Sequence, residues 1–382
     1  MLSLPERELS LRSELRILHC YRTFYPESKG GLEQVVLELA QNTHGSGVLT
    51  LAKEPGQRML DGKLPVLAER RWVSVASCCI GPGLVRRLFR LKAKLLHFHF
   101  PWPFGDVTYL LAGRSRPLII TYHSDIVRQR ALSLLYYPLM KIFLSRADRI
   151  VATSQNYMDS SPVLADFRSK VEVIPLGISE QEYPVPADND LLNMEARFGK
   201  DFMLFVGVLR YYKGLEYLIR ASVGRPYRVV IAGKGPEQAK LKVLADELGA
   251  DSIVFTGYIS DLEKAALMKL CRAVVFPSHL RSEAFGVTLI EGLMYGKPLI
   301  SCEIGTGTSY VNADGETGHV ILPANPDALR EAMDDLWNDP VKAEQMGQAG
   351  RLRYESLFTG ERMAAAYQKL YTQVLEERGL AT

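Results

Sequence analysis

The feature that most constrains the fold is an alternation of short, β-branched apolar runs with helix-like stretches that continues along all 382 residues. Such an alternation predicts parallel strands joined by helices that cover both faces of a sheet. In the first half, the pattern predicts a helix over residues 31–41. The strands expected there lie at residues 15–20, 48–51, 95–100, 118–122, 149–153 and 171–174.

The alternation restarts after a Pro- and Asp-rich stretch, residues 183–190, that has the composition of a linker. Because a chain of this length is too long for one compact core, the restart indicates a second domain. We therefore predict an α/β protein of two doubly wound Rossmann-like domains facing across a cleft, which the carboxyl ends of the strands line. The predicted parts are residues 1–182, residues 183–361 and a C-terminal helix within 362–382 that crosses back to the first domain. Strands of the second domain are expected at 202–207, 228–233, 252–256, 273–277 and 298–302.

The bulk composition excludes several classes of protein. The formal net charge of +3 is far below that of a dedicated nucleic-acid binder, so no nucleic-acid partner is expected. The five cysteines form no C-x-x-C pair and no zinc-binding spacing, which fits a reducing compartment. Residues 1–14 lack the apolar core of a secretion signal, and no apolar run approaches the roughly 18 residues that cross a bilayer. We expect a cytoplasmic protein, with a peripheral contact to the inner membrane left open.

The most informative segment spans residues 276–298, where an expected strand ends, a polar loop follows and a helix begins near Gly286. Because Gly286 has no side chain, a ligand can approach the backbone amides of the helix start, which suit a diphosphate. Glu283 lies in the loop and Glu291 lies inside the helix. Two carboxylates beside an anion site need other ligands, and the hydroxyl groups of a sugar and a ribose are the natural ones.

Glu283 and Glu291 are separated by seven residues, and this spacing resembles the E-x7-E signature of the retaining glycosyltransferase family 4, which has the GT-B fold. The resemblance implies that Glu283 and the loop after it contact the donor sugar. It also implies that Glu291 holds the ribose of the nucleotide. The donor-binding residues implied by this segment are Glu283, Ala284, Phe285, Gly286, Val287, Thr288 and Glu291.

Two cations follow the first expected strand of the second domain. Arg210 and Lys213 stand where fixed positive charges neutralise a leaving diphosphate, and the stretch resembles the Arg/Lys clamp of the family. Many members carry the arginine directly after the glycine, where this chain has Val208, so the role falls to Arg210. A solvated turn is the alternative. Further along, Tyr258 and Ile259 resemble the turn whose backbone meets the nucleotide base.

The first domain offers a glycine turn and a strand-end histidine. Gly30 and Gly31 resemble the N-terminal glycine loop of the family, but they do not form the G-x-G-x-x-G fingerprint of dinucleotide dehydrogenases. An ordinary turn is the alternative. His123 resembles the active-site histidine that reaches the donor sugar, and Asp125 is a weaker candidate for an acceptor hydroxyl.

No metal cofactor is expected. His97 and His99 alternate on one strand and share a face, but no third ligand at plausible spacing is evident, so packing or acceptor-side roles are favoured over metal binding. Asp188 and Asp190 match a D-x-D motif literally, but they lie in the expected linker, which makes a chance match the better interpretation.

A possible membrane contact comes from residues 84–96. This stretch predicts a basic amphipathic helix with Arg86, Arg90 and Lys94 on one stripe, which suits an anionic membrane surface. An ordinary surface helix that packs its apolar side on the sheet is the alternative.

Taken with the motifs around His123 and Arg210, the family resemblance is strongest to bacterial mannosyl- and rhamnosyltransferases of polysaccharide synthesis. It implies transfer of a D-mannose-type sugar from a GDP-sugar, with retention, to a polyprenyl-diphosphate-linked or growing glycan. His123 and Glu283 frame the sugar, Arg210 and Lys213 stabilise the leaving GDP, and Glu291 holds the ribose. A GT-B-like sugar-nucleotide epimerase and a non-catalytic two-domain sugar-binding protein are the alternatives.

Overall fold

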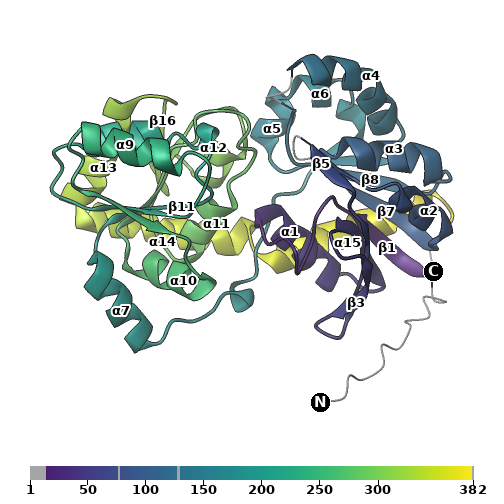
Figure 1. The fold of residues 1–382 in the computed structure, drawn as a ribbon, viewed down its shortest axis with the longest axis horizontal. Helices are drawn as coiled ribbons and strands as arrows, with labels where there is room; N and C mark the ends of the chain where they lie inside the picture. The colour runs from purple at the N-terminus through teal and green to yellow at the C-terminus, as the bar shows by residue number, and fades with distance from the viewer. Residues whose placement is uncertain (1–13, 76–77, 127–129, 381–382) are drawn as a thin grey trace. The chain divides into compact units, whose positions relative to one another are not determined.

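The structure is a computed structural model that describes residues 14–75, 78–126 and 130–380 (Figure 1). Most of the N-terminal segment that was inspected for a secretion signal therefore lies outside the described residues. The chain forms two compact units. Unit 1 contains the described residues up to Ala152, residues 163–174 and the C-terminal stretch from Met363. Unit 2 contains residues 153–162 and 175–362.

Unit 1 is built on an eight-stranded sheet in which all neighbours pair in parallel except β3 with β4. Its strand order is β10-β9-β8-β7-β1-β2-β4-β3, so β1 lies inside the sheet between β7 and β2. A separate antiparallel pair consists of β5 (Val73–Val75) and β6 (Cys78–Ile80). The strands of the sheet are β1 (Leu15–Cys20), β2 (Ser46–Ala52), β3 (Gly56–Leu60), β4 (Leu64–Arg70), β7 (Ala93–Phe100), β8 (Leu118–Tyr122), β9 (Arg149–Ala152) and β10 (Val171–Val173).

Helices cover both faces of this sheet. On one face, α1 packs on β2 and β4, and the C-terminal helix α15 places Tyr371 against His97 of β7; Figure 1 shows α15, in yellow, beside β1 and β7. On the other face, Phe98 of β7 contacts Tyr109 of α3 and Phe143 of α4. The helices are α1 (Gly31–Gln41), α2 (Gly83–Arg90), α3 (Pro103–Ala112), α4 (Arg130–Ser145), α6 (Pro162–Ala165) and α15 (Gly360–Glu377).

Unit 2 is built on a six-stranded, fully parallel sheet in the order β13-β12-β11-β14-β15-β16. Nearly every residue of its four central strands is buried, as expected for a sheet covered on both faces. The strands are β11 (Met203–Val206), β12 (Val229–Ala232), β13 (Ile253–Gly257), β14 (Ala273–Phe276), β15 (Leu299–Cys302) and β16 (Gly318–Ile321).

The helices of unit 2 also form two layers. One core joins the sheet to α8, α9 and α13, while α10 and α11 contact the sheet at β11 and β14. These elements are α5 (Gln155–Ser160), α7 (Asp188–Phe198), α8 (Leu215–Ser222), α9 (Gln238–Glu247), α10 (Asp261–Leu270), α11 (Val287–Met294), α12 (Gly307–Val311), α13 (Pro326–Asn338) and α14 (Pro340–Leu357). Short 3-10 turns are η1 (Arg168–Lys170), η2 (Glu180–Glu182) and η3 (Tyr211–Lys213).

Each expected strand is present, with bounds that move by two residues at most. Two other predictions are wrong. The basic helix expected at residues 84–96 stops at Arg90, because Leu91 turns extended and the apolar run after it pairs with β1 and β8; Lys94 therefore lies on β7 and not on a helical stripe. The expected linker at 183–190 ends early, because Asp188 begins α7 and Asp190 accepts a hydrogen bond from the amide of Ala187.

Candidate functional site

The predicted donor residues gather at the carboxyl edge of the unit 2 sheet. Lys213 follows β11, and Glu283 follows β14. These two strands are hydrogen-bonded neighbours, so the loops that leave them meet at one edge of the sheet. Gly214, with φ of +69°, lets the loop after β11 lie against the loop after β14, because a Cβ there would stand 1.9 Å from the carbonyl oxygen of Pro277.

Lys213 and Glu283 form an ion pair in which Nζ lies 2.5 Å from Oε2. Both side chains are nearly buried, at 11% and 12% exposure. The same carboxylate oxygen accepts a hydrogen bond from Ser278 Oγ at 3.2 Å, and the ammonium lies 4.4 Å from the centroid of the Phe276 ring. The lysine predicted for the diphosphate and the glutamate predicted for the sugar are therefore partners of each other.

Glu291 is buried inside α11, with 4% of the residue exposed. Its Oε1 accepts hydrogen bonds from Tyr183 Oη at 3.0 Å and from Lys264 Nζ at 2.7 Å. Burial opposes the charge of Lys264, but the carboxylate of Glu291 outweighs it, so the pKa of Lys264 is raised. Both partners therefore hold the same oxygen of the carboxylate, Oε1.

Sequence reasoning missed these two partners of Glu291. Tyr183 opens the stretch that was interpreted as a linker, and Lys264 lies on α10 among ordinary helix-surface charges. Neither residue type nor local spacing distinguishes them. Only the packing of α10 and of the segment before α7 brings them to Glu291.

The start of α11, where the sequence predicts an anion site, lies between the two glutamates in the chain. Gly286 is the residue before the helix and has φ of +86°, a backbone conformation that favours glycine. A Cβ there would lie 3.0 Å from the Phe276 ring. The first amides of the helix, from Val287 and Thr288, have no acceptor within the helix and point out of its positive end. Ala284 and buried Phe285 complete the loop, and the amide of Gly307 donates to the Ala284 carbonyl at 2.8 Å.

The other predicted donor residues are more exposed than this cluster. Arg210 is exposed, and its guanidinium forms no ion pair within the described part of the chain. Val208 is also exposed, at 51%. Tyr258 is 76% exposed and Ile259 is half-buried; both follow β13, which forms the edge of the sheet. Their contacts with a nucleotide stay predictions.

In unit 1, His123 follows β8 and is 2% exposed. Burial, and next the charge of Arg22, lowers the pKa of His123 from 6.5 to about 3, so the imidazole is neutral at physiological pH. Its Nε2 lies 3.1 Å from Nδ1 of His99. Asp125 accepts a hydrogen bond from Tyr122 Oη at 2.9 Å.

The glycine turn of unit 1 opens helix α1. Gly30 and Gly31 are both exposed, and Gly30 is the residue before the helix. A Cβ on Gly30 would lie 2.7 Å from Oε2 of Glu33. Glu33 in turn accepts hydrogen bonds from Thr23 Oγ1 and Ser28 Oγ at 2.8 and 2.7 Å. Glu33 thus organises the loop before α1.

The structure corrects the expectation that His97 and His99 have no third histidine nearby. His19 of β1 joins them, with one nitrogen from each of the three residues within 4.8 Å of the others. Both nitrogens of His97 are, however, hydrogen-bonded to protein hydroxyls, at 2.7 Å from Tyr371 and 2.7 Å from Thr121. Hydrogen bonding accounts for the arrangement of His97 without an ion.

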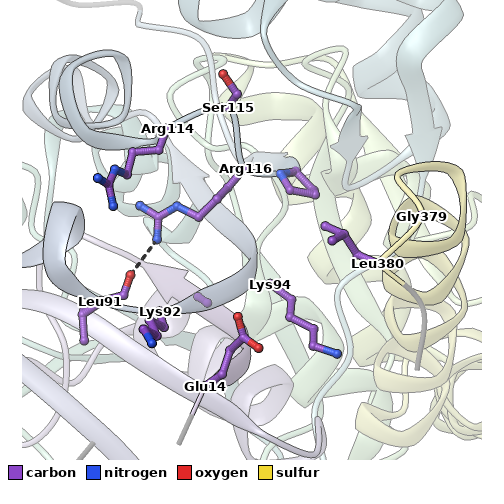
Figure 2. Close-up of a pocket in the computed structure, with 11 residues that line it drawn as sticks. Glu14, Leu91, Lys92, Lys94, Arg114, Ser115, Arg116, Gly379 and Leu380 are labelled. Carbon is purple, nitrogen blue, oxygen red and sulfur yellow. Dashed lines mark hydrogen bonds between the residues drawn. The ribbon is translucent and has the colours of Figure 1, made fainter. Parts of the chain in front are cut away.

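Two cavities lie at opposite edges of the unit 1 sheet. One of about 270 Å³ lies beside the carboxyl ends of β1 and β2, lined in part by Tyr25 and by Thr50, whose buried hydroxyl has no partner among the described residues. The other, of about 660 Å³, lies at the amino ends of β7 and β8 (Figure 2). In Figure 2 Arg114 and Arg116 occupy its upper rim, and Lys92 and Lys94 its lower rim.

Comparison with known proteins agrees with this architecture. The family description "Glycosyltransferase Family 4" matches residues 29–182, and "Glycosyl transferases group 1" matches residues 194–353. The D-rhamnosyltransferase WbpZ of Pseudomonas aeruginosa is 46% identical over 371 residues, covering 95% of this chain and 97% of that protein. The O-antigen chain mannosyltransferase C of Escherichia coli is 42% identical over 373 residues, covering 95% of this chain and 100% of that protein.

Among solved structures, sucrose-phosphate synthase from Thermosynechococcus elongatus shares the fold, with a TM-score of 0.78 and 19% identity over 95% of this chain and 100% of that chain. Two Rossmann-like units of this kind define the GT-B class of glycosyltransferases, so the protein is a sugar-transferring enzyme. The sequence identity of 46% and 42% to relatives over nearly their whole length also shows the family. The chain belongs to glycosyltransferase family 4.

Proposed function

We propose that this enzyme transfers a D-mannose-type sugar, mannose or rhamnose, from a GDP-linked donor to a growing O-antigen glycan, with retention of configuration. The observation that carries the proposal is the 46% and 42% identity, over nearly the whole chain, to a rhamnosyltransferase and an O-antigen mannosyltransferase. Sugar-nucleotide epimerases and non-catalytic sugar-binding proteins are not favoured by this kinship.

In the proposed reaction, binding of the donor breaks the Lys213–Glu283 ion pair. When the donor diphosphate enters at the start of α11, its negative charge competes with Glu283 for the Lys213 ammonium. Glu283 is then free to accept hydrogen bonds from sugar hydroxyls, which charged acceptors bind strongly. Both residues are nearly buried, so little solvent screening weakens the exchange.

Leaving-group stabilisation in this proposal uses protein groups only. Charge develops on the GDP as the glycosidic bond breaks, and preorganised cations and amides at that position lower the barrier. Lys213 and the first amides of α11 supply them, and exposed Arg210, three residues before Lys213, joins them when donor is bound. Glu291 accepts from the ribose hydroxyls through Oε2, since Tyr183 and Lys264 hold Oε1.

For the acceptor, we propose that the 270 Å³ cavity of unit 1 takes a sugar of the glycan. Tyr25 provides an aromatic face, and Glu27 and Arg58 provide charged hydrogen-bonding groups. The cavity lies at the carboxyl edge of the sheet, where ligands of such sheets bind.

We further propose that the acceptor is polyprenyl-diphosphate-linked and that the enzyme works at the cytoplasmic face of the inner membrane. No helix in the described ranges is both long and apolar enough to span a bilayer. The surface around the 660 Å³ cavity instead offers Lys92, Lys94 and Arg114 (Figure 2). The Arg114 guanidinium lies 3.8 Å from the ring centroid of Phe89, which is half-exposed. Clustered cations beside an exposed aromatic ring suit an anionic lipid surface.

The membrane contact is tested by vesicle sedimentation with the double variant Lys92→Glu/Arg114→Glu. Binding to anionic vesicles should fall by at least tenfold, since each cation near such a surface contributes about 1 kcal/mol and is here reversed. Lys240→Glu on α9 carries the same kind of charge change in unit 2 and is the control. Equal binding of all three proteins would exclude this surface.

The reaction is tested by incubating the enzyme with GDP-mannose, GDP-rhamnose and the corresponding UDP-sugars, with and without a lipid-linked O-antigen acceptor. The proposal predicts GDP release and an extended glycan that depend on the acceptor. Conversion of donor alone to an epimer would establish the epimerase alternative, and binding without turnover would establish the sugar-binding alternative.

A further inference from the structure

Four histidines line one face of the unit 1 sheet. His19 of β1 and His97 of β7 are register partners, and His99 lies two residues beyond His97 on the same face. His123 follows β8, whose Thr121 pairs with His99. All four histidines are at most 2% exposed, and His123 is the one that stands past the carboxyl end of its strand.

Three of these imidazoles form a hydrogen-bonded chain. His123 Nε2 lies 3.1 Å from His99 Nδ1, and His99 Nε2 lies 3.4 Å from His19 Nδ1. The rings of each neighbouring pair are nearly parallel, with an interplanar angle of 19° in both cases. At the two ends, His123 Nδ1 and His19 Nε2 are buried without a hydrogen-bond partner among the described residues.

The chemistry of neutral imidazole links the three tautomers. Each neutral ring carries one N–H and one lone pair, so His99 can donate toward only one neighbour and must accept from the other. Either all three rings carry the proton on Nε2, or all three carry it on Nδ1. Burial keeps all three rings neutral, because it lowers the pKa of His19 and His123 to about 3 and that of His99 well below 6.5.

A ligand at His123 decides between the two states. If the chain is protonated on Nε2, the ligand satisfies a lone pair of His123 and leaves an orphaned N–H buried at His19. If it is protonated on Nδ1, the ligand accepts the N–H of His123 and leaves only a lone pair at His19. A buried N–H without an acceptor is the rarer and costlier defect, so the second state is favoured.

We propose that His99 and His19 are positioning residues that hold His123 in the Nδ1–H tautomer, so that His123 donates a hydrogen bond from Nδ1 to an oxygen of the substrate. The inference rests on the proposed function for the identity of that substrate, a sugar donor or its glycan acceptor. The three hydrogen-bonded histidines orient a proton and do not conduct one, because His19 Nε2 has no hydrogen-bond partner among the described residues to pass a proton to.

A spectroscopic test uses the parent protein saturated with GDP-mannose. In protein labelled with ¹⁵N-histidine, long-range ¹H–¹⁵N correlation spectra report which ring nitrogen carries the proton. Single His→Phe variants assign the signals of His19, His99 and His123. In the complex, the proposal predicts the Nδ1–H tautomer for all three rings at pH 7.5, and the Nε2–H tautomer at His123 would overturn it. Stoichiometric metal in the purified protein would overturn it as well.

A matched pair of variants tests the consequence for catalysis. In His99→Asn the side-chain amide occupies the position of Nδ1 and still donates to His123, whereas in His99→Gln it occupies the position of Nε2 and faces His19. His99→Asn should keep kcat/KM within about threefold of the parent, and His99→Gln should lose about tenfold, the value of one neutral hydrogen bond. Asparagine is smaller than glutamine and leaves the larger cavity, so a purely structural role predicts that His99→Asn loses at least as much activity as His99→Gln, and that result would refute the proposal.

The two hypotheses fail separately. If the parent enzyme transfers no sugar from any GDP- or UDP-linked donor, the proposed function is wrong, while the tautomer of His123 in protein saturated with a sugar nucleotide still decides the positioning proposal. If transfer is observed but His123 carries its proton on Nε2, the positioning proposal alone is wrong.

Discussion

Lowering the pH from 7.5 to 5.5 should destabilise unit 1 by at least about 3 kcal/mol through its buried histidines, as linkage between protonation and folding requires. Burial lowers the pKa of His19 and His123 from 6.5 to about 3. Between these values the unfolded chain binds a proton at each site that the folded protein does not. The stability supplied by the neutral rings is therefore fully present above pH 6.5 and declines as the pH falls toward 3.

The magnitude follows from the pKa shifts. At pH 5.5, one unit below the unfolded pKa, each histidine that stays neutral in the folded protein lowers the free energy of unfolding by about 1.4 kcal/mol relative to pH 7.5. His19 and His123 together give about 3 kcal/mol on this basis. The pKa values of His97 and His99 are also lowered by burial, so these residues add to the effect in the same direction.

Urea denaturation at the two pH values measures this effect. A Trp337→Phe background leaves Trp72 and Trp102, both in unit 1, as the fluorescent reporters. In this background His19→Phe should reduce the pH-dependent difference by about 1.4 kcal/mol. His44→Gln replaces an exposed histidine after α1 and should leave the difference unchanged. An unfolding free energy of unit 1 that is equal at both pH values would refute the reasoning.

Two further predictions concern unit 2. Lys264→Met removes the cation beside buried Glu291 and should lower the unfolding free energy by about 3–5 kcal/mol in urea titrations, because the carboxylate is left buried and unpaired; an unchanged midpoint would mean that Glu291 is neutral. Gly214→Ala should cost more than Gly224→Ala in thermal unfolding. Both have left-handed backbones, worth about 1–2 kcal/mol for an alanine, but only at Gly214 does the Cβ meet a carbonyl oxygen. An equal loss of thermal stability in the two variants would show that the loop after β14 moves to accommodate the added Cβ.

The strands of both units are predictable from the sequence, because a strand that is buried on both faces of a parallel sheet consists almost entirely of apolar residues. The sequence also predicts the loop and helix around Glu283 and Glu291, since glycine, helix start and carboxylates lie within one short segment. The boundary between α2 and β7 was misplaced, because residues 84–96 fit a helical stripe locally and only pairing with β1 ends the helix at Arg90.

The residues that sequence reasoning missed act through long-range contacts. Tyr183 and Lys264 reach Glu291 from segments 108 and 27 residues away in the chain. His19 reaches His99 across 80 residues, through the insertion of β1 beside β7. No local pattern of residue types records such contacts, because the topology of the sheet creates them.

The most direct test of the donor site is equilibrium binding of GDP to the parent enzyme, to Glu291→Gln and to Glu283→Gln. The account predicts that Glu291→Gln weakens GDP binding by about 10–100-fold, since a ribose hydroxyl loses a charged acceptor. Glu283→Gln should retain GDP binding and lose sugar transfer, because Glu283 is assigned to the sugar. Undiminished GDP affinity in Glu291→Gln would contradict the placement of the nucleotide at the start of α11.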